Sequence, residues 1–326
     1  MVTTDHCPKP FWQTLRFILS NLIVIAYYLG QIKPEMEMVN GILFAMNTVM
    51  IPMFVFIAAY LTQDIKTSDI NRAILPAIIT CTAFQLINTV PIIIRGEFSL
   101  LDFFIKPLDG VWFIIAVPLW QWFSKMHAQL RHHPVITMLI FLVIGFFAFY
   151  YWYPYSGLFE IVAYFPIFFL GRRMTHRMIQ AWRATSVIYP LILFVSVVVV
   201  TTVGFHYLPE SMAFTKLYTL PIELAAIYYG VILYLCGVLG MVIIYFIRYL
   251  SILDSVAPKA LGVYLIHPIV CVIILYLLGR TGLVLDIPMA LFLAVITIMI
   301  SVGLAFIFPF NWLLAPKISH EEYGAA

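Results

Sequence analysis

The sequence predicts an all-α, polytopic membrane protein of about ten transmembrane helices, with the N- and C-termini in the cytoplasm. Three observations lead to this fold class: the composition, the long apolar runs, and the distribution of Lys and Arg. Of the 326 residues, 63% are hydrophobic and 10% are charged, and the mean hydropathy is +1.02. Soluble proteins carry about 25% charged residues, so this chain has too little polar surface to remain in water. We expect a single transmembrane domain over residues 1–326.

Ten apolar runs are candidates for membrane crossing, because a helix needs about 20 apolar residues to span the hydrocarbon core. They cover residues 11–30, 39–62, 72–94, 108–123, 134–152, 158–171, 187–205, 221–249, 256–279 and 287–314. The runs at 108–123 and 158–171 are the shortest of the ten.

The positions of Lys and Arg predict the orientation, since both are enriched in cytoplasmic loops. With the N-terminus placed inside and ten helices alternating, 13 of the 18 Lys and Arg residues fall in cytoplasmic segments. An odd number of helices would remove this bias, so the helix count and the orientation support each other.

Charge and cysteine usage exclude several function classes. The net charge of +3 is spread between the apolar runs, without the dense basic stripe of a protein that binds nucleic acid. Three of the four cysteines lie within apolar runs, where we expect them to pack as small hydrophobic residues. No carboxylate or cysteine is spaced to complete a metal site with His132 and His133, so no metal is expected.

Two segments between the runs each have two interpretations. The aromatic stretch at 150–155 (YYWYPY) is either an interfacial belt or a surface on which sugar rings stack. The basic segment with Arg172, Arg173, Arg177 and Arg183 is either an anchor against anionic membrane lipid or a grip on an anionic cytoplasmic donor.

Arg16 and Tyr27 are polar residues within the first run. Eleven residues are close to three helical turns, so both side chains project from one face, about 16 Å apart along the axis. Ser20 lies on the same face and Asn21 beside it. This pattern predicts a polar stripe that lines a cavity; the alternative is that Arg16 extends to the lipid headgroups.

His267 is the other candidate at membrane depth, and it precedes Pro268 in the ninth run. Proline lacks an amide hydrogen, so carbonyls of the preceding turn need other partners. His267 is therefore either a hydrogen-bonded packing residue or a catalytic group beside a helix break.

Short segments in a fixed order carry a family resemblance. They are Arg16-x10-Tyr27, IPMFVFIAAYL at 51–61, NRAILP at 71–76, GVWFI at 110–114, YFPIFFLG at 164–171 and LGVYLIHP at 261–268. In this order they resemble acyltransferase family 3, bacterial membrane proteins that O-acylate cell-surface polysaccharides. The resemblance spans about residues 11–270, and the ten-helix topology expected for that family is the one predicted above.

The resemblance implies a function and a set of site residues. It implies transfer of an acyl group from acyl-CoA, such as acetyl-CoA, to a sugar of an exopolysaccharide or lipid-linked glycan. The location would be the bacterial cytoplasmic membrane, alongside glycan synthesis machinery. The implied catalytic positions are Tyr27, Arg16 and His267. Arg16 and Arg72 would hold the donor's phosphates or stabilise negative charge, and Arg172 and Arg173 are the donor-binding candidates of the basic segment.

Several positions depart from the family pattern. The family's histidine in the first helix is replaced here by Tyr27. Tyrosine has an unperturbed pKa of about 10 and is a poor general base at neutral pH. Met50 stands where some members have histidine, Asp69 where arginine is common, and a glutamate expected near Pro118 is missing. A second hypothesis is therefore an inactive relative that acts in polysaccharide export or as a partner in a synthesis complex. A small-solute transporter is a third, although the paired broken helices of that class are not evident.

Overall fold

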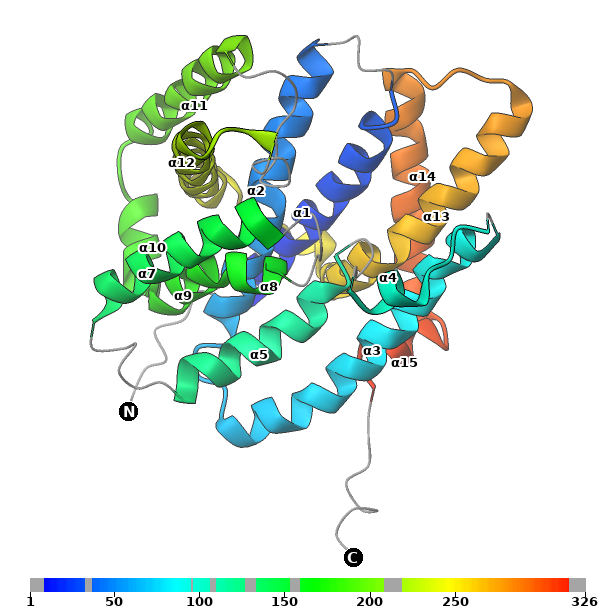
Figure 1. The fold of residues 1–326 in the computed structure, drawn as a ribbon, viewed down its shortest axis with the longest axis horizontal. Coiled ribbons are helices and arrows are strands. Elements are labelled where there is room, and N and C mark those ends of the chain that lie inside the picture. Colours follow the sequence, from blue (N-terminus) through cyan, green and yellow to red (C-terminus); the bar gives the residue numbers. More distant parts are fainter. Residues whose placement is uncertain are drawn as a thin grey trace, which may run out of the picture.

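The computed structural model describes residues 9–32, 37–94, 96–105, 110–126, 133–152, 159–207 and 219–316. In these ranges every regular element is a helix and there is no strand (Figure 1). The longer helices are α1 (Lys9–Leu29), α2 (Glu37–Leu61), α3 (Thr67–Ile94), α5 (Trp112–Met126), α7 (Pro134–Phe147), α11 (Ile188–Tyr207), α12 (Ile222–Phe246), α13 (Ala260–Thr281) and α14 (Ile287–Phe306). Shorter helices are α4 (Leu100–Ile105), α8 (Phe159–Ala163), α9 (Phe165–Arg173), α10 (His176–Arg183) and α15 (Phe310–Leu314). Single turns lie at η1 (Ala148–Trp152), η3 (Ser251–Leu253) and η4 (Ala257–Lys259).

Within the described ranges, six helices are long and apolar enough to cross a membrane. They are α2, α3, α7 with η1, α12, α13 with η4, and α14. A seventh crossing is possible through α10 and α11, which pass the same test together but are bent by 90° where they meet. The chain is thus a multi-pass membrane protein. The count of ten crossings and the cytoplasmic termini stay predictions.

The predicted runs coincide with helices, but two of them are interrupted. The run at 158–171 is divided into α8 and α9 at Tyr164, and Pro166 occupies the first turn of α9. Proline is favoured in a first turn because its missing amide hydrogen has no partner to lose there. The run at 187–205 begins after the bend that follows α10. The run at 108–123 forms α5 from Trp112 onward, and residues 106–109 lie outside the described part.

Helix α1 is the central element of the bundle. It packs against α2 on one side and against α13 and α14 on the other (Figure 1). Buried residues occur around most of its circumference, for example Trp12, Leu15, Leu19 and Tyr28. Because neighbouring helices surround α1, its polar side chains can lie at membrane depth without facing lipid, as polar residues in membrane proteins generally do.

Helix α9 approaches α2 closely at a glycine. A Cβ on Gly171 would lie 2.6 Å from the carbonyl oxygen of Phe56 and 2.8 Å from Cβ of Ala59. Small residues allow this kind of close helix contact in membrane proteins. Gly171 and Ala59 belong to two of the segments that carry the family resemblance, 164–171 and 51–61. These two segments therefore lie in contact.

Candidate functional site

Tyr27 and His267, predicted from separate runs, lie against each other in the structure. Tyr27 is on α1 and His267 on α13, and their ring centroids are 6.1 Å apart with an interplanar angle of 87°. This is an edge-to-face arrangement. The His267 side chain is 3% exposed. The pair is therefore an internal feature of the helix bundle.

The imidazole of His267 is held through its Nδ1 atom. Nδ1 lies 3.1 Å from the carbonyl oxygen of Val263 and 2.9 Å from that of Tyr264. The Tyr264 carbonyl would normally accept a bond from the amide of residue 268, but Pro268 has no amide hydrogen. Both partners are acceptors, so Nδ1 must carry the hydrogen, and Nε2 is then the unprotonated nitrogen that can accept one.

Tyr264 is itself fixed by neighbouring helices. Its hydroxyl donates a hydrogen bond to the carbonyl of Gly110, 3.2 Å away, and its ring packs on Phe54 of α2 and Phe113 of α5. Gly110 has φ +77°, and a Cβ there would lie 1.8 Å from the Tyr264 hydroxyl. Only glycine suits both the positive φ and the close approach. Gly110 and Tyr264 belong to two segments that carry the family resemblance, but the sequence did not predict that they touch.

Arg16 lies on α1, on the face predicted from its spacing to Tyr27. Its Nε is inaccessible to solvent and has no hydrogen-bond partner among the described residues, and no ion pair to Arg16 occurs in that part of the chain. Arg16 as a whole is half-buried, but a buried polar atom without a partner is costly. Such a group is typical of a site that receives water or an anionic ligand.

Other unpaired buried polar atoms gather around the same helix. Among the described residues, nine side-chain N or O atoms are buried without a hydrogen-bond partner. Six of these belong to α1 or to helices packed on it: Trp12 Nε1, Thr14 Oγ1, Arg16 Nε, Asn21 Oδ1, Thr48 Oγ1 and Ser301 Oγ. Ser20 differs, because its hydroxyl bonds to the Phe17 carbonyl at 2.8 Å. Asn21 is one residue from Ser20 and therefore points about 100° away from the Arg16–Tyr27 face, so the unpaired atoms of α1 lie on more than one face, and a cavity lined by the polar stripe stays a prediction.

The arginines predicted to bind the donor lie at the opposite end of α1 from Tyr27. Arg172 donates hydrogen bonds to the carbonyls of Thr62 and Gln63, each at 3.1 Å, where α2 ends. The nearby Tyr60 packs on Trp12, near the start of α1. Since Trp12 and Tyr27 are 15 residues apart in one helix, about 22 Å separates this end from the Tyr27–His267 pair.

Arg173 and Arg72 present exposed side chains. Arg173 lies over the ring of Phe169, with its guanidinium carbon 5.2 Å from the ring centroid. Arg72 is exposed in the second turn of α3. The structure thus brings Tyr27 and His267 together, and it does not bring Arg172 to them.

Arg183 has a contact that the sequence did not predict. It donates to the carbonyls of Ile244 at 2.9 Å and Ile247 at 2.6 Å, where α12 ends, and its guanidinium lies 4.0 Å from the Phe11 ring centroid. Terminal carbonyls of a helix lack intrahelical partners, and a cation there is favourable. Two arginines of the basic segment, Arg172 and Arg183, therefore cap two different helices.

The remaining features are the aromatic stretch at 150–155, the cysteines and the groups that could hold a metal ion. Tyr150 donates a hydrogen bond to the Leu220 carbonyl at 3.0 Å and stacks on Phe146, whereas Tyr151 is 50% exposed. Residues 153–155 of the aromatic stretch, and His132, lie outside the described ranges. Cys81, Cys236 and Cys271 are not in disulfide bonds, and the last two are buried as expected. In the described ranges, no group of three His, Cys, Asp or Glu side chains could hold a metal ion.

No family model, no curated protein and no solved structure matches this chain. The helices of the described ranges show by themselves a helical, multi-pass membrane protein.

Proposed function

We propose that this chain is a membrane O-acyltransferase of the family 3 type, which transfers an acetyl or similar group from acyl-CoA to a sugar of a surface polysaccharide in the bacterial cytoplasmic membrane. The observation that carries the proposal is the contact between Tyr27 and His267, in which Nδ1 of His267 is engaged and Nε2 is the accepting nitrogen. An enclosed imidazole in a fixed tautomer is suited to general base catalysis.

His267 would act on the acceptor hydroxyl. Nε2 takes the proton from a sugar hydroxyl while the hydroxyl oxygen attacks the thioester carbonyl carbon. The new C–O bond forms, the C–S bond breaks, and the CoA thiolate takes the proton from His267. The backbone carbonyls of Val263 and Tyr264 stabilise the imidazolium that exists between these steps, because both accept from Nδ1.

Tyr27 would act as a hydrogen-bond donor. A phenol with an ordinary pKa is protonated at neutral pH, so it does not serve as a base. It can donate to the oxygen that becomes negative when the thioester carbonyl is attacked. This role explains how the site could retain activity although the family histidine is absent from position 27.

Arg16 would hold the anionic part of the donor. Its position about 16 Å along α1 from Tyr27 favours donor binding over direct contact with the reacting carbonyl. Arg72 and Arg173, which are exposed, would attract the CoA phosphates at the same membrane surface. Arg172 contributes by holding the end of α2, as its bonds to Thr62 and Gln63 indicate.

A second candidate function is that of a catalytically inactive relative in polysaccharide export or glycan synthesis. The replacement of histidine by Tyr27 favours it, because loss of a general base typically lowers a rate by about 10²–10⁴-fold. The two candidates differ in whether acyl groups move.

Transfer of labelled acetyl groups distinguishes them. Membrane vesicles that contain the chain and its native glycan are given acetyl-CoA labelled in the acetyl group, and label in the glycan fraction is measured. We expect label with the wild type and with His133→Gln, the matched control at an exposed histidine before α7. We expect its loss with His267→Gln. Equal labelling with all three chains, or none above vesicles lacking the protein, contradicts the enzyme proposal.

A further inference from the structure

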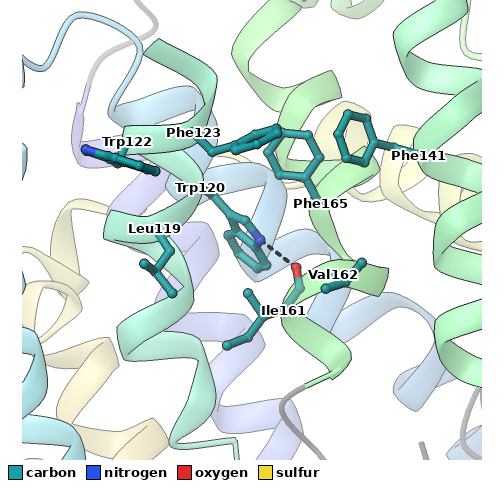
Figure 2. A pocket seen from close by; sticks show the side chains of 8 residues that line it. All are labelled: Leu119, Trp120, Trp122, Phe123, Phe141, Ile161, Val162 and Phe165. Carbon is teal, nitrogen blue, oxygen red and sulfur yellow. Dashed lines mark hydrogen bonds between the residues drawn. The ribbon is translucent and has the colours of Figure 1, made fainter. Parts of the chain in front are cut away.

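An apolar cavity lies at the side of the bundle, between α5, α7, α8 and α9. Its volume is about 250 Å³. Its lining consists of Leu119, Trp120, Trp122, Phe123, Phe141, Ile161, Val162 and Phe165 (Figure 2). None of these side chains is charged, and five of the eight are aromatic.

The side chains that line the cavity provide few polar groups for a ligand. The indole N–H of Trp120 donates to the carbonyl of Ile161 at 2.6 Å, the bond drawn in Figure 2. This bond uses the only donor of the indole ring, so Trp120 has no hydrogen left for a ligand. The volume is also below the roughly 300–1,000 Å³ of pockets that hold drug-sized ligands. A slender apolar group is therefore the occupant that the chemistry favours.

The mouth of the cavity joins the surface that faces lipid. Leu119, Trp122 and Val162 line the cavity and are 37–41% exposed. Beside them, α7 crosses the membrane and presents exposed apolar side chains, including Leu139, Ile140 and Val143. A cavity that opens on this surface meets lipid chains rather than water.

The inner wall is made of aromatic rings that pack on one another. Phe165 packs on Phe141 and Phe123 with centroid distances of 4.4 and 5.3 Å. Trp120 packs on Phe168 at 5.1 Å. A lipid chain gains dispersion contacts with such a wall, which matter in the bilayer because the hydrophobic effect does not favour burial there.

We infer that this cavity is a binding site for one acyl chain of a bilayer phospholipid, which enters sideways between α5 and α7. The inference does not depend on the proposed acyl transfer. The bound chain lies against Trp120, and Trp120 in turn packs on Trp112 and Phe113. The site is thus separate from the Tyr27–His267 pair, although Phe113 also contacts Tyr264.

Photochemical labelling in bilayers tests the inference. The full chain is reconstituted in phosphatidylethanolamine and phosphatidylglycerol bilayers with a trace of phosphatidylcholine that carries a diazirine in mid-chain. Labelled residues are then located by mass spectrometry. We expect several-fold more label at Trp122, Phe141 and Val162 than at Val143, which is 56% exposed on α7 but does not line the cavity.

A filled cavity provides the decisive comparison. Val162→Trp places an indole in the cavity and should lower the label there to the level of Val143, whereas the control Val143→Trp should leave it unchanged. Leu119→Trp, at the mouth, serves if the first variant fails to elute as a monodisperse protein. Equal label at Val143 and the cavity, no effect of a filled cavity, or cross-links from the cavity to a second copy would each overturn the inference.

Discussion

At the scale of single residues, His267 and Pro268 act together. Pro268 has no amide hydrogen to donate to the Tyr264 carbonyl, and Nδ1 of His267 donates to that carbonyl instead. The proline thereby leaves the Tyr264 carbonyl open to the imidazole, which adds a second acceptor for Nδ1 beside the Val263 carbonyl. In the proposed reaction Pro268 is a positioning residue, because it acts through the imidazole.

Pro268→Ala should separate activity from stability. The new amide hydrogen competes with Nδ1 for the Tyr264 carbonyl, so we expect acetyl transfer to fall. The helix gains a backbone hydrogen bond and loses a helix-breaking residue, so we expect the thermal midpoint in detergent to stay level or rise. A fall in both quantities would indicate that Pro268 has only a packing role.

Tyr27→Phe tests the hydrogen-bond donor. The substitution removes the hydroxyl and keeps the ring that packs edge-to-face on His267. Loss of one oxyanion donor typically costs about 10²–10³ in kcat, so we expect a decrease of that order with little change in KM. Unchanged kcat would exclude Tyr27 from the chemistry.

The site residues could be predicted from sequence to the extent that polarity within apolar runs marks them. Arg16, Tyr27 and His267 were singled out in this way, since ionisable groups at membrane depth are rare, and of these the structure brings Tyr27 and His267 into contact. The role of Arg172 was not found, because its partners at Thr62 and Gln63 lie about 110 positions away. A basic residue after an apolar run indicates a membrane surface but not which helix end it will cap.

At the scale of elements, arginine caps and one glycine contact hold the helices together. Arg183 joins α10 to the end of α12, Arg172 joins α9 to the end of α2, and Gly171 lets α9 approach α2. Arg183 is the last residue of α10, directly before the bend at which the chain changes direction by 90° into α11. The basic segment therefore joins helices of the bundle through Arg172 and Arg183.

Arg183→Ala should destabilise the protein. It leaves the carbonyls of Ile244 and Ile247 without their donor, and hydrogen bonds to charged groups contribute about 1.5–3 kcal/mol each. We expect a lower thermal midpoint in detergent, with a smaller change for Arg177→Ala, an exposed arginine of the same helix. Equal midpoints for the two variants would argue against the cap.

Gly171→Ala should disturb the contact between α2 and α9. The added Cβ meets backbone and side-chain atoms at 2.6 and 2.8 Å, and such overpacking typically costs about 1–3 kcal/mol. Gly230→Ala in α12 is the matched control, since a Cβ there has nothing within 4 Å. The thermal midpoints of the two variants are compared in detergent, and we expect a lower midpoint for Gly171→Ala. A Gly230→Ala control that loses as much stability would contradict the packing argument.

At the scale of the whole molecule, the apolar runs predicted the helices well because both lipid and protein interior select apolar side chains. The apolar runs did not distinguish helices that face lipid from helices that are enclosed by other helices. Helix α1 is not among the six spans, since Arg16, Asn21 and other polar residues lower its hydropathy, yet it packs against α2, α13 and α14 inside the bundle. The break at Tyr164 was likewise missed, because apolar residues continue through it.

The predicted orientation places the loop near Ser251 in the cytoplasm and the loop near Val284 outside. Both residues are exposed. In a chain whose four native cysteines are replaced, we expect Val284→Cys to react with an impermeant maleimide added to intact cells. Ser251→Cys should react only after the membrane is opened. The reverse pattern would invert the topology and place Arg16 at the wrong end for a cytoplasmic donor.

The most direct test of the central claim is the O-acyl ester content of surface polysaccharide in cells that lack the gene, restored with wild type or with His267→Gln. Protein level and detergent stability of the two chains are matched first. The account predicts that ester content falls on deletion, returns with the wild type and does not return with His267→Gln. Unchanged ester content on deletion, with an altered amount or export of the glycan, would contradict acyl transfer and leave the fold with a non-catalytic role.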